Sequence, residues 1–347
     1  MTKIQKHIEI VRSSILSLSS LSLKSAQAIE ASLKHTYSHV SITTVNSTAD
    51  LEALVVRMPD LVFSGIKYVP QDPLLGFNDP NKVWLAEYLE DAGIACTGSG
   101  RFAHELELSK DLSKQRVLDS GLSTSPFYVI RMGFDAPDFS QLTYPVFVKP
   151  SDRGGGEGID SDSVAYDKYS LMRKANQLMN EFGADTLVEQ YLSGREFSVA
   201  ILKDRGTLGY TVMPVELIAP KDMNGARILS SAVKSADTES FHEVDDVILR
   251  IKLETLALDV FHALGARDYG RIDIRLDSEG TPHFLEANLI PSLIDGYGNF
   301  PKACMLNAAI GYDDMLLHIV ELALTRQMPV DNPAPGLPLK LLVPLPV

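Results

Sequence analysis

The sequence predicts an α/β protein that is divided into several compact lobes. The chain has 347 residues, which is more than one compact unit usually holds, so two or three units are expected. In the first hundred residues, segments of strand character alternate with segments of helical spacing. The short apolar run at residues 61–63 ends in Ser64 and Gly65, which is typical of a buried parallel strand. These observations favour an α/β fold with α+β lobes.

Composition and charge exclude several kinds of partner. The net charge of −13 opposes non-specific binding to nucleic acid or to an anionic membrane, although it is compatible with a local basic pocket for phosphates. No apolar run reaches the length of a membrane span, and the Ser-rich residues 10–23 lack the cleavage motif of a signal peptide. Cys96 and Cys304 match no metal-binding spacing, so we expect free thiols and a cytoplasmic location.

A first α/β unit accounts for the N-terminal hundred residues. Strands and helices alternate there, and we expect them, in chain order, at residues 8–11, 22–33, 40–45, 61–63 and 81–92. The loop Thr97-Gly98-Ser99-Gly100 then marks a boundary between units.

Two further units are expected after this loop. The second holds a helix at residues 105–120 closed by Gly121, a strand at 144–148 leading into Lys149 and Pro150, a glycine-rich loop, a helix at 170–182 and a strand at 187–190. The third holds strands at residues 196–202 and 210–215, a polar stretch at 219–239, a helix at 247–264, a hairpin at 271–288 and a helix at 313–324. Residues after 330 are Pro-rich and cannot continue that last helix.

The hairpin at residues 271–288 is the most informative segment. If its turn is centred between residues 279 and 280, Asp273 lies opposite Glu286, and Arg271 lies opposite Asn288. Two opposed carboxylates repel each other, but a divalent cation between them reverses the sign of that interaction. Two carboxylates and an amide on one face suit a hard ion such as magnesium. The alternative is a solvated polar face on an ordinary hairpin.

A glycine-rich loop after Lys149 predicts a phosphate site. Glycines let backbone N–H groups approach a phosphate closely, and the lysine supplies a positive charge. The loop is neither a Walker A loop nor a dinucleotide fingerprint, because its lysine precedes the glycines. A mobile surface loop is the alternative. The glycines concerned are Gly154, Gly155, Gly156 and Gly158.

Two weaker features accompany this loop. Lys110 and Lys114 lie one helical turn apart and form a basic helix face, which serves either phosphates or simple solvation. Residues 189–196 place glutamates at a strand end and a turn, where they can meet a nucleobase and ribose hydroxyls. Exposed glutamates are the common alternative for that segment.

The order of these motifs resembles that of the ATP-grasp superfamily, and within it most closely the D-alanine–D-alanine ligases. The resemblance runs from about residue 88 to residue 288 and extends to residue 324. It implies a three-lobed ATP-grasp fold with an N-terminal α/β domain at 1–104. It further implies a central lobe with a glycine-rich lid at 105–193, a C-terminal lobe with the metal site at 194–330, and a tail at 331–347.

The resemblance also implies roles for individual residues. ATP is expected to contact Lys110, Lys149, Gly154, Gly155, Gly156, Gly158, Glu189, Leu192 and Glu196, with Glu189 and Leu192 at the adenine and Glu196 at the ribose. Magnesium, with manganese as a substitute, is expected at Asp273, Glu286 and Asn288. Arg271 and Lys149 are the expected catalytic side chains, with Arg271 at the oxyanion of a tetrahedral intermediate. The implied reaction joins a small carboxylate to an amine through an acylphosphate, in a homodimer.

Three departures from the family pattern concern the amino-acid side of the site. Gly155 and Gly156 stand where these ligases usually carry two serines. No glycine-rich turn with a glutamate occurs between residues 8 and 24, where the first substrate's ammonium is usually held. Residues 291–293 read Pro-Ser-Leu where Pro-Gly-Met is usual. We therefore expect a ligase with an altered carboxylate or amine substrate.

Other functions stay open at this point. One is a genuine D-alanine–D-alanine ligase whose sequence has drifted, and another is a non-catalytic ATP-binding protein. A pure binder has no need of an oxyanion cation, so the presence of Arg271 argues against the second. A kinase or carboxylase of the same superfamily is a further alternative, because phosphoryl transfer to a carboxylate is a shared first step.

Overall fold

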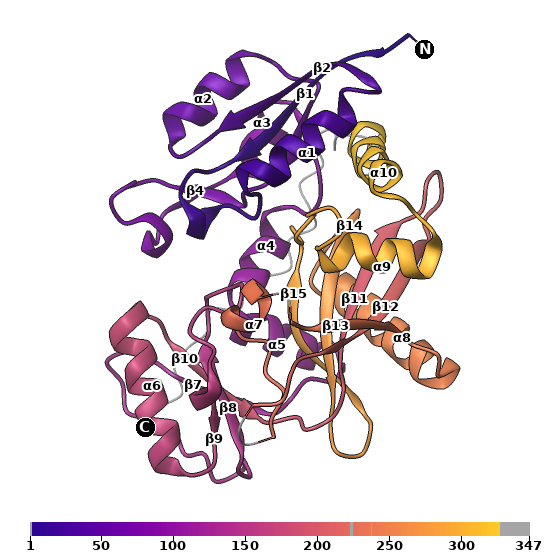
Figure 1. The fold of residues 1–347 in the computed structure, drawn as a ribbon. Coiled ribbons are helices and arrows are strands. Elements are labelled where there is room, and N and C mark those ends of the chain that lie inside the picture. The colour runs from indigo at the N-terminus through magenta and orange to yellow at the C-terminus, as the bar shows by residue number, and fades with distance from the viewer. Residues whose placement is uncertain (1, 223–224, 237, 327–347) are drawn as a thin grey trace.

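The computed structural model describes residues 2–222, 225–236 and 238–326, and the predicted Pro-rich tail lies outside them. The described residues form three larger sheets, each in its own part of the chain, and a two-stranded sheet. In Figure 1 the first of the larger sheets lies at the top, the second at the lower left and the third at the right. No described helix is long and apolar enough to cross a membrane.

The N-terminal lobe is a four-stranded parallel sheet in the order β2-β1-β3-β6. Its strands are β1 (Ile4–Arg12), β2 (Tyr37–Thr44), β3 (Leu61–Ser64) and β6 (Ala95–Cys96). The predicted buried parallel strand is confirmed as β3, in which Leu61, Val62 and Phe63 are fully buried. Helices α1 (Leu23–Leu33) and α2 (Thr48–Val56) begin at the capping serines Ser22 and Ser47.

The predicted helix at residues 81–92 is wrong in its first part. Residues Lys82–Trp84 form strand β5, which pairs with β4 (Tyr68–Pro70), and helix α3 covers only Leu85–Asp91. The Trp84 ring packs 5.5 Å from that of Tyr68, so a cross-strand aromatic contact replaces the helical turn. Short 3₁₀ turns at Leu16–Leu18 and Gly76–Asn78 lie beside this hairpin.

The predicted helix at residues 105–120 is also wrong as a single element. Two helices, α4 (Arg101–Leu108) and α5 (Lys110–Asp119), meet at Ser109, whose φ of −117° and ψ of 97° are extended. The break occurs because the backbone N–H of Lys110 donates 2.9 Å to the carbonyl of Ser151 instead of to its own helix. This bond fixes the start of α5 against the end of a strand in the central lobe. Gly121 closes α5 with a φ of +73°, as expected.

The central lobe is an antiparallel sheet in the order β7-β10-β8-β9 that packs against one long helix. Its strands are β7 (Phe127–Ile130), β10 (Thr186–Gln190), β8 (Val146–Pro150) and β9 (Val164–Ala165). Helix α6 (Lys168–Phe182) begins at the capping box of Asp167 and ends at Gly183. A 3₁₀ turn at Ser161–Ser163 joins the glycine-rich loop to β9.

The C-terminal lobe is a five-stranded antiparallel sheet in the order β13-β12-β11-β14-β15. Its strands are β13 (Ser240–Glu243), β12 (Tyr210–Ile218), β11 (Glu196–Lys203), β14 (Tyr269–Leu276) and β15 (Pro282–Asn288). Helix α8 (Val247–Ala263) and helix α9 (Asn299–Ala308) pack against this sheet (Figure 1). The predicted polar stretch at 219–239 contains the short helix α7 (Ser231–Ala236).

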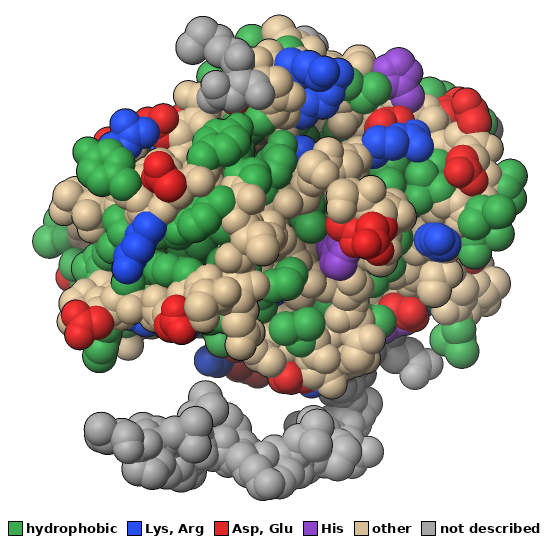
Figure 2. Space-filling model, turned by 90° about the horizontal axis from the view of Figure 1, so that it is seen from below, with side chains coloured by type: hydrophobic (Ala, Val, Ile, Leu, Met, Phe, Trp, Pro, Cys, Tyr) green, Lys and Arg blue, Asp and Glu red, His purple; other side chains and the backbone are tan. Residues whose placement is uncertain are grey.

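Helix α10 (Tyr312–Thr325) returns to the N-terminal lobe, where it contacts α1 and β3. One hydrophobic cluster consequently joins the first sheet, α9, α10 and the inner strands of the C-terminal sheet, and buries Phe63, Met213 and Phe300. Acidic and basic side chains are interspersed among apolar ones on the face seen in Figure 2, which is not uniformly basic. Cys96 and Cys304 are buried free thiols, as predicted.

Candidate active site

A cavity of about 520 Å³ is lined by side chains from all three lobes. This volume lies in the range of ordinary small-molecule sites. The N-terminal lobe contributes residues near β4 and the central lobe contributes the glycine-rich loop, while the C-terminal lobe contributes the β14–β15 hairpin. Every residue predicted to bind nucleotide or metal lines this cavity except Gly158 and Lys110. The Nζ of Lys110 nevertheless lies 3.8 Å from the carboxylate of Glu286, which does line the cavity.

The hairpin has the predicted pairing at the site. Arg271 pairs with Asn288 and Asp273 pairs with Glu286. The route to this pairing differs from the prediction, because the register shifts by one residue between Asp273 and Ile274. The turn is correspondingly one residue longer, with the N–H of Asp277 donating to the carbonyl of Thr281. The bulge and the longer turn have opposite effects on the strand register, so Asp273 still lies opposite Glu286.

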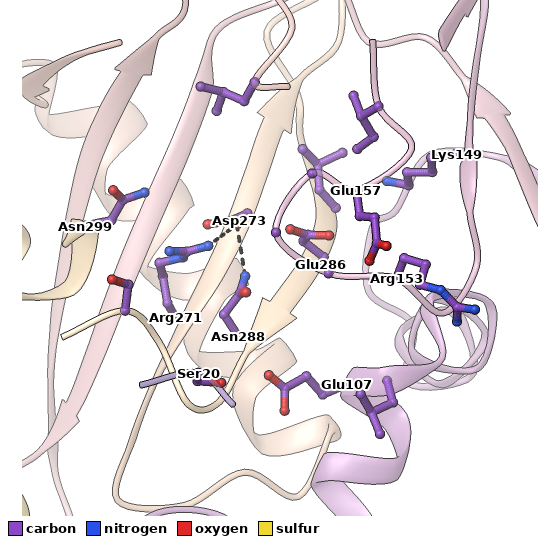
Figure 3. Close-up of a pocket in the computed structure, with 18 of the residues that line it drawn as sticks. Ser20, Glu107, Lys149, Arg153, Glu157, Arg271, Asp273, Glu286, Asn288 and Asn299 are labelled. Atoms are coloured by element: carbon purple, nitrogen blue, oxygen red, sulfur yellow. Dashed lines mark hydrogen bonds and ion pairs between the residues drawn. The ribbon is translucent and has the colours of Figure 1, made fainter. Parts of the chain in front are cut away.

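A compact network surrounds Asp273, as Figure 3 shows. One carboxylate oxygen accepts from the Ser198 hydroxyl at 2.8 Å. The other accepts from Nη2 of Arg271 at 2.9 Å and from Nδ2 of Asn288 at 3.1 Å. The Nε atom of Arg271 is buried and has no hydrogen-bond partner among the described residues. A guanidinium that is anchored at one end and unpaired at another is suited to bind an oxyanion.

Glu286 lies across the strand pair from this network and is partly open to the cavity. Its carboxylate lies 3.8 Å from the Nζ of Lys110, which also donates to the backbone carbonyl of Arg153. Burial lowers the pKa of Lys110, and the carboxylate of Glu286 partly offsets that effect. Lys110 therefore places a buried cation directly behind Glu286 and beneath the glycine-rich loop.

Glu189 is held between two buried lysines. Its carboxylate lies 2.6 Å from Nζ of Lys149 and 2.8 Å from Nζ of Lys114. Burial alone would raise the pKa of the Glu189 carboxyl, but the two ammonium groups lower it to about 2. Burial lowers the pKa of Lys114 to about 8, whereas the surrounding carboxylates raise that of Lys149 despite its burial. The alternatives of a solvated lysine face and of an exposed glutamate are therefore wrong.

The rest of the segment 189–196 also faces the cavity. Leu192 is buried and Glu196 lies 3.1 Å from Nη1 of Arg275. The guanidinium of Arg275 stacks 5.1 Å from the ring centroid of Tyr191. Acidic and apolar side chains therefore both line the cavity where β10 leads into β11.

The glycine-rich loop is tied to the N-terminal lobe by Arg153. Its Nη2 donates 2.9 Å to Oδ1 of Asn78 and 2.7 Å to the carbonyl of Phe182, and its Cζ lies 4.3 Å from the ring centroid of Phe77. The loop ends at Gly158, which has a φ of +74° and where a Cβ atom would lie 2.8 Å from Pro150. Glycine is therefore required at that end of the loop.

Sequence reasoning missed a second charged group in the cavity wall. Glu107 accepts from Nζ of Lys67 at 2.9 Å, from Nδ1 of His104 at 2.9 Å and from the backbone N–H of Leu289 at 2.7 Å. Burial alone would raise the pKa of the Glu107 carboxyl, but Lys67 and His104 lower it to about 2. The only local signal is the spacing of three residues between His104 and Glu107 on one helix.

The stability of the protein is expected to fall at acidic pH because of Glu107 and Glu189. Both carboxyls have a folded pKa of about 2 against an ordinary value of 4.5. Their stabilisation is complete above pH 4.5 and is lost as pH falls toward 2, by about 3 kcal/mol each. The free energy of unfolding, measured with urea between pH 7 and pH 3, should fall less steeply with decreasing pH in Glu107→Gln and in Glu189→Gln than in the wild type. The exposed Glu279→Gln serves as the control, and an unchanged slope in both buried variants would contradict the assignment.

The donor set at Asp273, Glu286 and Asn288 fits a hard divalent cation in its chemistry. All three donors are oxygen-bearing side chains, and two of them are opposed carboxylates. Within the described residues, no group of three or more His, Cys, Asp or Glu side chains could hold a metal by itself. Such a site therefore depends on further oxygen ligands, of the kind that phosphates supply to magnesium.

Comparison with known proteins identifies the family. The family model for the D-ala D-ala ligase C-terminus matches residues 119–321. A D-alanine–D-alanine ligase of Bordetella pertussis is 31% identical over 236 residues, which cover 67% of this chain and 71% of that protein. An uncharacterized protein of Sinorhizobium fredii, y4sG, is 30% identical over 242 residues, with 69% of each chain covered.

Solved structures show the same fold. The D-alanine–D-alanine ligase of Bacillus anthracis complexed with ATP superimposes with a TM-score of 0.71 and 18% identity, covering 92% of this chain and 97% of that one. This likeness confirms the predicted three-lobed ATP-grasp fold. The chain therefore belongs to the D-alanine–D-alanine ligase family and is an ATP-dependent ligase that forms a carbon–nitrogen bond.

Proposed function

We propose that this protein joins a small carboxylic acid other than D-alanine to an amine through an acylphosphate. The observation that carries the proposal is the cavity itself. It brings an opposed pair of carboxylates, a guanidinium with an unpaired Nε and a buried lysine into one space that is lined by all three lobes. Phosphoryl transfer requires such positioned charges, because the protein contributes little covalent chemistry of its own.

In this proposal the nucleotide lies between the central and C-terminal lobes. The adenine lies at the wall of Glu189 and Leu192, the ribose at Glu196 and the phosphates at Lys110, Lys149 and the loop glycines. The carboxylate of Glu189 already binds two lysines, so the main role of Glu189 is to hold Lys149 in place. Magnesium would be held by Asp273, Glu286 and Asn288 together with phosphate oxygens, and would neutralise charge on the transferring phosphoryl group.

The reaction then proceeds in two steps. A carboxylate oxygen of the acid attacks the γ-phosphorus of ATP, and ADP leaves with the electrons of the broken bond. The amine nitrogen next attacks the acyl carbon, the tetrahedral intermediate expels phosphate, and the nitrogen loses a proton. We assign the stabilisation of the intermediate's oxyanion to Arg271, whose Nε is free for this contact among the described residues.

The altered substrate is supported by the residues that depart from the family pattern. Gly155, Gly156 and Ser292 line the cavity, while Leu293 is fully buried and does not line it. In the N-terminal lobe, Leu18 lines the cavity and no glutamate is present in residues 8–24 except Glu9. Glu9 is bound to Arg57 and Thr43 and does not line the cavity. The ammonium group of an amino-acid substrate would therefore lack a carboxylate partner from residues 8–24 in this cavity, and burying an unpaired charge is costly.

The deciding experiment is phosphate release from ATP with D-alanine as sole acid and amine. We expect weak or no release, and stronger release with another amino acid or small carboxylate. Turnover with D-alanine alone in the ordinary range of about 1–10³ per second would show a genuine D-alanine–D-alanine ligase instead. ATP binding without release for any acid would favour the non-catalytic binder.

Lys149→Met is expected to weaken ATP binding by about 1.5–3 kcal/mol, the usual scale for a hydrogen bond to a charged group. The substitution removes the ammonium but keeps most of the stem, and Glu189 retains Lys114 as a partner. Calorimetric titration with a non-hydrolysable ATP analogue measures the effect. Lys174→Met is the matched control, since Lys174 is a buried lysine of the same lobe that pairs with Asp160 outside the cavity. Equal ATP affinity in wild type and Lys149→Met would refute the phosphate contact.

A further inference from the structure

The part of the cavity formed by the N-terminal lobe has its own chemistry. We propose that it binds the acid substrate through a hydrogen-bond-accepting oxygen group, a hydroxyl or a second carboxylate, and not through an α-ammonium group. This inference rests on the proposed function, because it names the class of acid that the ligase activates. It is carried by Lys67, Glu107 and Tyr68 in the cavity wall.

Lys67 presents the charge at this end. Its Nζ lies 2.9 Å from Oε1 of Glu107, and its side chain is 19% exposed against 4% for that of Glu107. The backbone of Lys67 is fixed, since its carbonyl accepts from the N–H of Leu85. The Lys67 side chain is therefore the more accessible partner of the pair. An ammonium bound once by a carboxylate still has hydrogens to donate.

Glu107 is poorly placed to receive a substrate ammonium. Its carboxylate already accepts from Lys67, from Nδ1 of His104 and from the N–H of Leu289. Figure 3 shows Glu107 on the same side of the cavity as Ser20 and away from Lys149. A substrate ammonium approaching this carboxylate would meet the Lys67 ammonium, and like charges at short range repel.

The other acidic groups of the cavity do not change this conclusion. Asp152 pairs through Oδ2 with Nη1 of Arg153 at 2.8 Å, whereas its Oδ1 is buried without a hydrogen-bond partner among the described residues. Glu157 lies on the glycine-rich loop, beside Arg153 and towards Lys149 and Glu286 in Figure 3. Glu239 also lines the cavity, and its Oε2 has no hydrogen-bond partner among the described residues, but it directly precedes β13 of the C-terminal lobe. Asp152 and Glu157 belong to the loop of the central lobe, so none of the three carboxylates belongs to the N-terminal lobe.

Tyr68 supplies the second and independent observation. Tyr68 is 3% exposed and lines the cavity, and its hydroxyl has no hydrogen-bond partner within the described part of the chain. A buried hydroxyl without a partner is costly, and an oxygen of a bound substrate would satisfy its O–H donor. Ser17 and Ser20 line the same end, and Leu18, Phe77 and Leu108 form its apolar wall. The subsite thus combines hydrogen-bond donors with an apolar wall.

Hydroxylamine gives a test that does not require the natural amine. Its nitrogen attacks the acyl carbon of an acylphosphate, phosphate leaves, and the stable product is a hydroxamate. The full chain, ATP and magnesium would be assayed with matched racemic acids: alanine, lactate and propanoate, then phenylalanine and 3-phenyllactate, then succinate. We expect kcat/KM for hydroxamate formation to be at least about tenfold higher for the hydroxy acids or for succinate than for the amino acids. Lactate and succinate distinguish a hydroxyl from a second carboxylate.

Lys67→Met tests the assignment to this side chain. It should lower kcat/KM for the preferred acid by about ten- to a hundredfold and raise that for the amino acids, because Glu107 then becomes available to an ammonium. Lys67→Met combined with Glu107→Gln should abolish that gain for the amino acids. Lys34→Gln is the control, since it breaks a lysine–glutamate pair on the surface of α1. An unchanged substrate preference in folded Lys67→Met would overturn the role of Lys67.

Failure of this inference can be told apart from failure of the proposed function. Hydroxamate from the amino acids in preference to their hydroxy analogues would overturn the inference and leave the ligase function in place. Absence of hydroxamate from every acid would contradict the proposed function. In that case, calorimetric titration of alanine and lactate into the protein bound to a non-hydrolysable ATP analogue decides the inference. Tighter binding of lactate would support it, and equal or tighter binding of alanine would overturn it.

Discussion

Glu286→Gln is expected to lower turnover by a factor on the order of a hundred or more while leaving the fold intact. Glu286 lies opposite Asp273 in the β14–β15 pair, and its side chain is 26% exposed, so the substitution removes one charge without leaving a cavity in the core. The amide keeps the shape and one oxygen donor but loses the negative charge that a divalent cation needs. Phosphate release should therefore fall most at limiting magnesium.

The control and a second measurement make this result specific. Glu279→Gln changes an exposed glutamate in the turn of the same hairpin and should leave turnover unchanged. Manganese serves as a paramagnetic probe of binding in the presence of an ATP analogue, and its affinity should fall in Glu286→Gln but not in the control. Wild-type activity of Glu286→Gln at limiting magnesium would remove this residue from the metal site.

The hairpin shows what a sequence can predict about a site. Alternation along two short runs places Asp273 and Glu286 on one face, and that property depends only on neighbouring residues. The bulge beside Asp273 was not predicted, because alternation carries no information about an extra residue in one strand. The pairing was nevertheless correct, since the longer turn at Asp277–Thr281 offsets the bulge.

Features that depend on distant contacts were not predictable in this way. Helical spacing continues across residues 101–119, and the break at Ser109 follows from a bond between Lys110 and Ser151, 41 positions along the chain. Lys67 and Glu107 are likewise far apart along the chain and carry no motif. Only the folded chain brings them together in one cavity wall. The nucleotide and metal residues could be predicted because they lie in motifs that follow one another in a recognisable order, whereas the proposed substrate end is assembled from isolated residues.

Arg271→Lys is expected to lower kcat by about a hundred- to a thousandfold, the usual loss for one oxyanion donor, with little change in KM for ATP. Lysine keeps the positive charge beside Asp273, so the buried carboxylate does not lose its counter-ion. It loses the planar fork that lets one guanidinium bind Asp273 through Nη2 and offer Nε to a second oxygen. The effect should therefore fall on the step that forms the tetrahedral intermediate and not on nucleotide binding.

Two comparisons separate this role from a structural one. Arg205→Lys alters an exposed arginine that pairs with Glu321 and should leave kcat and KM unchanged. Arg275→Lys changes the next arginine on the same strand face, which binds Glu196, and should raise KM for ATP more than it lowers kcat. Hydroxamate formation under single-turnover conditions, with the most active acid, measures the acyl-transfer step directly. If Arg271→Lys raised KM for ATP as Arg275→Lys does and left kcat intact, Arg271 would be a nucleotide contact and the oxyanion would require another donor.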